Sequence, residues 1–548
     1  MRVDNSHKKE LFSRNFTKFG LDMNPVVSIL SGLIVIAFSG FALTNLEYAN
    51  TVFSKLKATI ITNFDWLFIL SSCLFIIMCL FLAFSKFGKI RLGGKDIKPE
   101  FSNFAWYSML ISAGMGIGLM FWSVGEPLYH NKYLPPIFQS GDTVTSALST
   151  TFFHWGFHPW GIYALMSLSL AYFAFNKNLP LSMRSVFYPI FKERIFGIVG
   201  DLIDVLAVVA CLFGLATSLG LGVQQINSGL EYLFNVPYNV NIQVILIISI
   251  TLIATLSVVS GIDKGVKFLS ELNIKIAGAF MLAVLLFGPT MFILRTFSNS
   301  LGLYLNDFIN SSFFINTGEG TWQGDWSIFY LAWWISWSPF VGMFVARISK
   351  GRTIKEFVLA VMIIPSFLSF IWLSVFGGTS IYLDQITNGA IFQAVQSNLP
   401  VAMFEMIKYM DIAQVIKTIL SVLGTFLVIS FFVTSSDSGS LVVDNITSGG
   451  KIDSPVPQRV FWASMEGLVA AILLLIGGEK ALIALQTAVI TTGLPFAILM
   501  TVMGFALIHT VRKDFKVMDI PGYNEKVVEL KDIKSKKTIT SNKLVDVE

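Results

Sequence analysis

Apolar residues fall into stretches of about 20 along the chain, each bounded by shorter polar segments. A helix of that length crosses roughly 30 Å of hydrocarbon, so each stretch predicts one membrane-spanning helix. About twelve stretches meet this criterion. They begin near Pro25, Trp66, Phe104, Ser146, Leu202, Ile242, Ile274, Ile328, Phe357, Val415, Val460 and Ala481. We therefore expect an all-α polytopic membrane protein.

Two of these stretches carry residues that interrupt helices. The third contains Gly114, Gly116 and Gly118, which we predict to form a hinge, and the eighth, five spans later, contains Pro339 and Gly342. Glycines in one span alone favour close helix packing as the explanation. Paired breaks in corresponding positions of two halves instead indicate a transporter built from inverted repeats, with its site near the membrane midplane.

This symmetry predicts the organisation of the whole chain. We expect a cytoplasmic N-terminal arm (1–23), two leading helices (24–90), a first repeat of helices 3–7 (91–295), an amphipathic helix at the outer interface (296–320), a second repeat of helices 8–12 (321–510) and a cytoplasmic tail (511–548).

Basic residues follow the second, fourth, eighth and twelfth spans, which places both termini in the cytoplasm of a cell (inner) membrane protein. The net charge of +5 reflects this loop bias and gives no reason to expect nucleic-acid binding. The Lys-rich segment 531–537 is either a solvated end or a contact with anionic lipids of the inner leaflet. Cys73, Cys79 and Cys211 fall in apolar spans, and their spacing predicts packing residues.

A broken third span exposes backbone carbonyls, which suit a hard cation at membrane depth. The tenth span ends in Thr434, Ser435, Ser436 and Ser438, with Asp437 among them. Hydroxyls in apolar helices commonly bond back to their own turn. Opposite an unwound carbonyl run, they predict a sodium site.

Tryptophan and tyrosine gather in the fourth and eighth spans. Trp155, Trp160 and Tyr163 lie on one side of a helical wheel, and Pro159 is expected to distort the turn between them. Trp334 and Trp337 share a face of the eighth span, next to Trp333. Tryptophan more often marks the membrane interface, but these positions are mid-span. A quaternary ammonium is held by ring faces at roughly 0.5–2 kcal/mol each, so betaine, choline and carnitine fit.

Other polar residues within the spans have less specific interpretations. For His154 and His158 a structural, hydrogen-bonded role is favoured over a proton relay, because no carboxylate pairs with them in sequence. Glu126 is expected to cap or gate the outer end of the third span, and Glu466 is a functional candidate without an assigned partner.

An enzyme is not expected. The chain has no H-E-x-x-H, P-loop or G-x-S-x-G motif, and with only five histidines, two of them (His7 and His509) at the cytoplasmic ends, a metallohydrolase is hard to assemble. Without a nucleotide site, transport must be driven by an ion gradient or by exchange. Repeated pore rings that would indicate a channel are not evident in the sequence.

Four motifs, AGMGIGLMFWSVGEP, HWGFHPWGIYAL, WWISWSPFVGMFVARISKGRTIKEF and VTSSDSGS, resemble those of the betaine/choline/carnitine transporter family. The resemblance extends from about Asn24 to His509. It implies two leading helices and a five-plus-five inverted repeat, a fold similar to that of sodium-coupled amine and amino-acid symporters, assembled as a homotrimer.

The resemblance also implies roles for particular residues. The substrate's trimethylammonium is expected in an aromatic box formed by Trp155, Trp160, Tyr163 and Trp334, with Met115 beside the substrate and Trp337 on the route to the cytoplasm. One sodium site is expected at the carbonyls of Ala113 and Met115, Phe431, and the hydroxyls of Thr434 and Ser435. A second is expected near Phe340, Thr217 and Ser218.

The glycine motif bears on the subtype. Family members that resemble Met-Gly-Ile-Gly are typically sodium-coupled betaine importers, whereas proton-coupled choline importers tend to carry Asp at the position of Gly118. The resemblance therefore favours sodium symport of glycine betaine for osmoprotection, with no cofactor besides the coupling ion. A choline or carnitine importer and an ion-independent exchanger are the alternatives. Ser123, where betaine carriers often have Gly, and a tail without a long basic helix depart from the family pattern.

Overall fold

A computed structural model describes residues 11–114, 116–259, 263–318, 320–451, 455–478 and 481–518. Over these residues the fold is all-α, and extended pairing is limited to two isolated bridges, Phe16–Met23 and Arg91–Thr353. The predicted all-α membrane protein is therefore confirmed. Nine helices in the described part are long and apolar enough to cross a membrane, or ten when one bent pair is counted as a span.

The long helices lie where the hydrophobic stretches predict them. They are α2 (Pro25–Thr44), α3 (Leu46–Phe84), α10 (Ile198–Phe234), α11 (Val240–Val259), α12 (Asp263–Phe287), α15 (Phe329–Ile348), α16 (Ile354–Ile386), α19 (Gln414–Thr447), α20 (Val456–Gly477) and α21 (Ala481–Met518). The shorter helices are α8 (Met183–Val186), α9 (Tyr188–Phe191), α13 (Thr290–Asn306), α14 (Phe308–Ser312), α17 (Ala390–Ser397) and α18 (Ala402–Tyr409). Cys73, Cys79 and Cys211 are buried, as predicted.

The third span is broken as predicted. It consists of α4 (Asn103–Gly114) and α5 (Ile117–Lys132), whose axes differ by 61°. Gly116 is the N-cap of α5 and has extended backbone angles. Met115, expected to line the substrate site and to supply a sodium ligand, lies outside the described residues.

The fourth span is also broken, into α6 (Thr143–Trp155) and α7 (Phe157–Ala171), with Gly156 between them. A proline ring clashes with the carbonyl four residues earlier, here that of Trp155, and is tolerated in the first turn of a helix. Pro159 lies in the first turn of α7. The distortion predicted at Pro159 is therefore a complete break three residues upstream.

The predicted break in the eighth span is wrong. α15 continues through Pro339 and Gly342 without interruption. Pro339 leaves the carbonyl of Ile335 without its helical donor. The hydroxyl of Ser338 donates to that carbonyl at 2.7 Å and replaces the missing bond. The irregularity lies instead at the start of this span, in a π-helical turn over Gly324–Ile328.

Two predicted boundaries differ from the structure. α13 begins at Thr290 and ends at Asn306, so 296–320 is not a single amphipathic helix. α21 continues to Met518, inside the segment predicted as tail. Within the predicted arm, Leu11 is buried and Arg14 forms an ion pair with Asp201 at 2.6 Å. The basic segment 531–537 lies outside the described residues.

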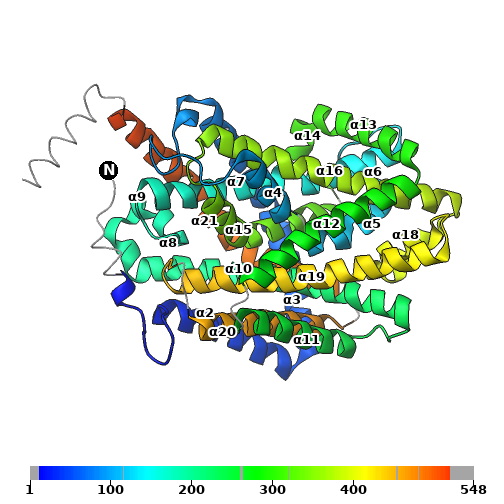
Figure 1. Cartoon of the computed structure of the whole chain (residues 1–548), viewed down its shortest axis with the longest axis horizontal. Coiled ribbons are helices and arrows are strands. Elements are labelled where there is room, and N and C mark those ends of the chain that lie inside the picture. The colour runs from blue at the N-terminus through cyan, green and yellow to red at the C-terminus, as the bar shows by residue number, and fades with distance from the viewer. Residues whose placement is uncertain are drawn as a thin grey trace, which may run out of the picture.

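Figure 1 shows α10 and α19 running along the length of the molecule, where they pack against each other. The first described residues (dark blue) and the end of α21 (red) lie at one end, together with α8 and α9. α13, α14 and α18 lie at the opposite end. The two ends of the described chain are therefore at the same end of the molecule.

Candidate functional site

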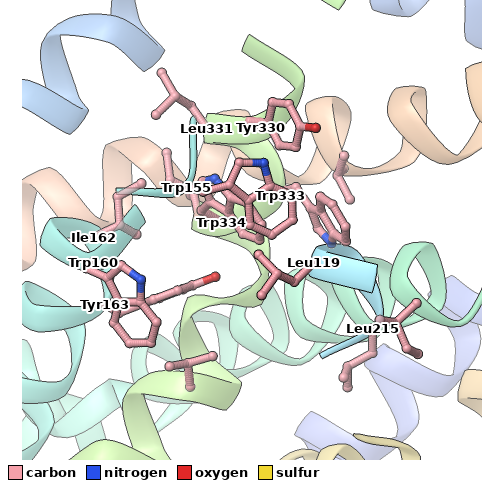
Figure 2. Packing of buried hydrophobic residues seen from close by; sticks show 14 of the residues in the cluster. Leu119, Trp155, Trp160, Ile162, Tyr163, Leu215, Tyr330, Leu331, Trp333 and Trp334 are labelled. Carbon is pink, nitrogen blue, oxygen red and sulfur yellow. The ribbon is translucent and has the colours of Figure 1, made fainter. Parts of the chain in front are cut away.

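The breaks in the third and fourth spans meet at a small aromatic cavity. It is lined by Ala113, Gly114, Gly116, Gly118, Leu119, Trp155, Pro159, Trp160, Tyr163, Trp334, Trp337 and Ser369. The structure thus brings together the five aromatic residues expected at the substrate site, which come from α6, α7 and α15. Figure 2 shows Trp155 and Trp334 on one side and Trp160 and Tyr163 on the other, with the Tyr163 hydroxyl pointing toward Leu119.

The rings of this box are close to one another and are held in edge-to-face contacts. The ring centroids of Trp155 and Trp334 are 4.9 Å apart, and those of Trp160 and Tyr163 are 5.3 Å apart. The ring centroids of Tyr163 and Trp334, which complete the box, are 6.3 Å apart. No acidic residue is among those that line the cavity. Such a site offers π faces rather than hydrogen-bond acceptors to a cation.

The break in the fourth span positions one wall of the box. It leaves carbonyls at the end of α6 without helical donors, and the indole Nε1 of Trp334 donates to one of them, that of His154, at 3.0 Å. Trp334 also stacks on Trp333, with centroids 4.9 Å apart and ring planes 11° apart. The orientation of the Trp334 indole is therefore set by a hydrogen bond on one edge and a ring on one face.

Glu126 holds a second wall. Its carboxylate is fully buried and accepts hydrogen bonds from Trp155 Nε1 at 2.8 Å and from the Tyr330 hydroxyl at 2.6 Å. His154 Nδ1 lies 2.6 Å from the other carboxylate oxygen. His154 thus has the hydrogen-bonded surroundings expected of a structural role, and its carboxylate partner, which the sequence did not indicate, comes from another helix. The expected cap or gate at Glu126 is a buried hydrogen-bonding centre beside the box.

Two donors at the box have no partner within the described residues. The hydroxyl of Tyr163 and the indole Nε1 of Trp337 are both buried without a hydrogen bond. A buried polar group without a partner costs free energy, about 1–3 kcal/mol. Both groups are therefore available to a ligand that carries hydrogen-bond acceptors.

Trp337 lies between the box and a larger cavity of about 660 Å³. Trp337 and Ala113 line both spaces. The larger cavity extends to Glu100 and Arg347, which belong to the side predicted to be cytoplasmic. Trp337 thus separates the two cavities, and its place on the route to the cytoplasm stays a prediction.

The larger cavity also contains the predicted sodium ligands. Ala113 lines it from the broken third span, and Phe431, Thr434 and Ser435 line it from α19. The Thr434 hydroxyl donates to the Ser430 carbonyl at 3.0 Å, the back-bonding expected in an apolar helix. Its oxygen lone pairs are not used by that bond and can still coordinate a cation.

The structure does not bring together the residues of the second predicted sodium site. Phe340 lines the larger cavity, whereas Thr217 and Ser218 are not among its lining residues. The Thr217 hydroxyl donates to the backbone carbonyl of Phe213 at 2.9 Å and to that of Leu485 in α21 at 3.3 Å. The second site stays a prediction without geometric support.

The hinge glycines differ in how closely they approach the box. A Cβ atom at Gly114 would lie 2.8 Å from Trp160, and one at Gly118 would lie 2.8 Å from Trp333 and 3.1 Å from Trp155. At Gly116 the nearest atom, in Trp337, would be 3.9 Å away. Gly114 and Gly118 are therefore required for the close approach of the indoles as well as for bending.

The two remaining polar candidates, His158 and Glu466, are buried in the protein interior. The His158 ring packs on Phe153 at 4.3 Å and on Phe308 at 5.3 Å. Glu466 is fully buried on α20, and one of its oxygens lies 3.4 Å from the hydroxyl of Ser436.

Sequence reasoning missed Tyr330 as a neighbour of the box. It lies one turn before Trp334 in α15, and the rings stack at 5.9 Å. The four-residue spacing of the two aromatic residues was the available signal. The contact of Tyr330 with Glu126 had no such signal, because 204 residues separate them.

Comparison with known proteins gives a result that is consistent with the family resemblance of the motifs. Residues 26–516 match the profile of a family described as BCCT, betaine/carnitine/choline family transporter. The chain is 47% identical to glycine betaine transporter 1 of Vibrio parahaemolyticus, over 91% of this chain and 96% of the relative. It is 44% identical to a glycine betaine/proline/choline transporter of the same organism, over 93% of each. It is 42% identical to a probable glycine betaine transporter of Desulfitobacterium hafniense, over 89% of this chain and 97% of the relative.

Proposed function

The chain belongs to the betaine/carnitine/choline family of transporters, and from this membership we propose that it imports glycine betaine by sodium symport, for osmoprotection. The members and relatives are transporters rather than enzymes. The proposal concerns the substrate, the coupling ion and the physiological role.

The observation that carries the proposal is the aromatic box between the two broken spans. A quaternary ammonium cannot donate a hydrogen bond, and the faces of aromatic rings attract it through their quadrupoles. Trp155, Trp160, Tyr163 and Trp334 surround one cavity, and none of the described residues that line it is acidic. This arrangement suits a trimethylammonium group.

The two unpaired donors support glycine betaine over choline. Glycine betaine carries a carboxylate, which accepts charge-assisted hydrogen bonds, whereas choline carries a hydroxyl. The Tyr163 hydroxyl and Trp337 Nε1 are buried without partners in the described part of the chain. We propose that they donate to the carboxylate while the rings hold the ammonium.

Sodium would bind where the unwound segment faces α19. The carbonyl of Ala113 is freed by the break, and Thr434 and Ser435 line the same cavity. An ion held by both elements would fix the broken span and favour substrate binding. Such reciprocal coupling is typically worth about 1–3 kcal/mol. The homotrimer is a further expectation from the family resemblance, and the contacts with anionic lipids are an expectation from the Lys-rich segment 531–537.

Reconstituted transport tests the proposal. Proteoliposomes containing the purified chain are expected to accumulate labelled glycine betaine when an inward sodium gradient is imposed, and to lose accumulation when sodium is replaced by potassium. Accumulation that is unchanged in sodium-free buffer would refute symport and favour exchange. Absence of any uptake, with folded protein in the membrane, would refute the import function.

Choline is the second candidate substrate, because one relative at 44% identity is described as a glycine betaine/proline/choline transporter. A competition experiment on uptake distinguishes glycine betaine from choline as the preferred substrate. Unlabelled choline is expected to reduce glycine betaine uptake only at concentrations well above those at which unlabelled glycine betaine does so.

A further inference from the structure

Three potential metal ligands converge next to the aromatic box. They are Glu126 and His130, one turn apart on α5, and His154 on α6, whose ligand atoms all lie within 4.8 Å of one another. The three residues are 0%, 1% and 2% exposed. The group thus combines two imidazoles and one carboxylate in a buried position.

One oxygen of Glu126 faces both imidazoles. Oε1 lies 2.6 Å from His154 Nδ1 and 3.4 Å from His130 Nε2. His130 Nε2 is buried and makes no hydrogen bond within the described residues. A nitrogen that is aimed at a carboxylate without a hydrogen bond to it can act as a ligand for a cation placed between them.

The atoms behind these ligands already have partners. The second oxygen of Glu126, Oε2, accepts from Trp155 Nε1 and from the Tyr330 hydroxyl. The second nitrogen of His154, Nε2, lies 2.9 Å from the Ser327 hydroxyl. Ligating carboxylates and imidazoles in metal sites are held in this way, by hydrogen bonds on the atoms that face away from the ion.

We propose that Glu126, His130 and His154 form a site for a transition-metal dication of the Zn²⁺ class, and that its occupancy weakens binding of the organic cation in the box. Two imidazoles and one carboxylate favour Zn²⁺ over sodium, magnesium or calcium, which prefer oxygen ligands. Three protein ligands leave one coordination position for water. The ion takes the place of the contact between Glu126 and His154.

The link to the box is electrostatic and passes through Trp155. Without the metal, the carboxylate of Glu126 is hydrogen-bonded to an indole that also forms a wall of the substrate cavity. A bound dication reverses the local charge, and two cations close together in a low-dielectric interior repel. Because the two binding equilibria are thermodynamically linked, the substrate must weaken metal binding by the same factor by which the metal weakens substrate binding.

Access is expected from the end of α5 that is predicted to face outward. Trp322 and Trp326 pack against the His130 ring, with centroids 5.7 Å and 4.6 Å away. Both tryptophans are partly exposed. They form the layer through which an ion would reach the cluster.

Metal binding is measured first, because it does not depend on transport. The purified full chain in detergent, treated with chelator, is equilibrated with Zn²⁺ or with Mg²⁺, and bound metal is counted by elemental analysis after dialysis. His509→Gln is included in every variant, since that histidine is exposed. We expect one tightly bound Zn²⁺, no comparable Mg²⁺, and zinc X-ray absorption that shows two imidazole ligands.

His130→Gln is the diagnostic variant, because the Nε2 atom of His130 makes no hydrogen bond within the described residues that the substitution would remove. We expect its affinity for Zn²⁺ to fall by about tenfold or more. His158→Gln is the matched control, since it removes a buried histidine four residues from His154 that is not part of the cluster. Its affinity for Zn²⁺ is expected to match that of the parent.

The coupling to the box rests on the proposed function and is measured separately. Zn²⁺ is expected to raise the KM for glycine betaine uptake in the parent and less so in His130→Gln, each compared with its own rate in chelator. Equal Zn²⁺ affinity in the parent and in His130→Gln, or an absorption spectrum without two imidazoles, overturns the site. Zn²⁺ binding without any change in KM overturns the coupling. A failure of all uptake refutes the proposed function but leaves the metal measurements interpretable.

Discussion

Glu126 accepts a hydrogen bond from the indole of Trp155 at 2.8 Å, and both side chains are buried. The contact joins a carboxylate in the third span to a wall of the aromatic box in the fourth. The same carboxylate oxygen binds the Tyr330 hydroxyl of α15. One buried charge on α5 thus sets the positions of groups from two other helices, α6 and α15, that surround the box.

Glu126→Gln is expected to raise the KM for glycine betaine on the order of tenfold. The substitution keeps the shape and one oxygen acceptor but removes the charge that strengthens the bonds to Trp155 and Tyr330, and such bonds are worth about 1.5–3 kcal/mol. Initial uptake rates over a range of substrate concentrations measure the effect. Glu47→Gln, at an exposed carboxylate of α3, is the control. An unchanged KM in Glu126→Gln would show that the carboxylate does not position the box.

Trp334→Ala is expected to weaken glycine betaine binding by roughly 2- to 30-fold, the loss of one cation–π contact. The indole is 3% exposed and is held by the bond to the His154 carbonyl. Isothermal titration of the detergent-solubilised protein measures the dissociation constant directly. Trp66→Ala removes an indole that is 46% exposed and should leave the constant unchanged. Equal constants for the two variants would place the substrate elsewhere.

Gly118→Ala is expected to reduce glycine betaine affinity by roughly tenfold, whereas Gly116→Ala should be tolerated. A methyl group at 118 would lie 2.8 Å from Trp333 and 3.1 Å from Trp155, so the cost of overpacking, about 1–3 kcal/mol, falls on the walls of the box. At 116 the nearest atom would be 3.9 Å away. The KM values for glycine betaine uptake of Gly118→Ala and Gly116→Ala test this expectation. A larger effect at 116 would indicate that bending, rather than contact with the indoles, limits transport.

The close contacts around Gly118 limit what a Gly118→Asp variant can show about the coupling ion. Any side chain at 118 meets the indoles of Trp333 and Trp155. Loss of uptake in Gly118→Asp therefore does not by itself report on the coupling ion, and its sodium dependence must be compared with that of Gly118→Ala.

The sequence predicted the two aromatic clusters because they follow rules that act within single spans, and the family resemblance implied that they form one box. Trp334 and Trp337 share a helical face, and Pro159 marks a disturbed helix start. The contacts that orient the box were not predictable in this way. Glu126 and His154 are 28 residues apart on different helices, and only tertiary packing brings them together. The eighth span was misjudged because a side-chain hydroxyl, that of Ser338, compensated for Pro339.

Arg184→Met is expected to lower the stability of the protein by about 3–5 kcal/mol, because it leaves the buried carboxylate of Asp204 without its counter-charge and Asp201 with Arg14 alone. Arg184 is fully buried and pairs with Asp201 at 2.9 Å and Asp204 at 2.6 Å. Burial alone would lower the pKa of its guanidinium, but the two carboxylates outweigh burial and the pKa is raised. Thermal unfolding in detergent measures the change, with Arg295→Met, at an exposed site of α13, as the control. Matching unfolding temperatures would contradict a stabilising role for this pair.

Thr434→Ala is expected to raise the sodium concentration for half-maximal glycine betaine uptake by about tenfold, the loss of one oxygen ligand. The Thr434 hydroxyl directs its proton to the Ser430 carbonyl, so its lone pairs are free for a cation in the cavity that Ala113 also lines. Ser438→Ala is the matched control, because that hydroxyl lines the same cavity from the same helix, one turn later. Its sodium dependence should equal that of the parent. If Thr434→Ala and Ser438→Ala respond to sodium alike, the ion does not use the Thr434 hydroxyl, and the coupling site must lie elsewhere along the broken third span.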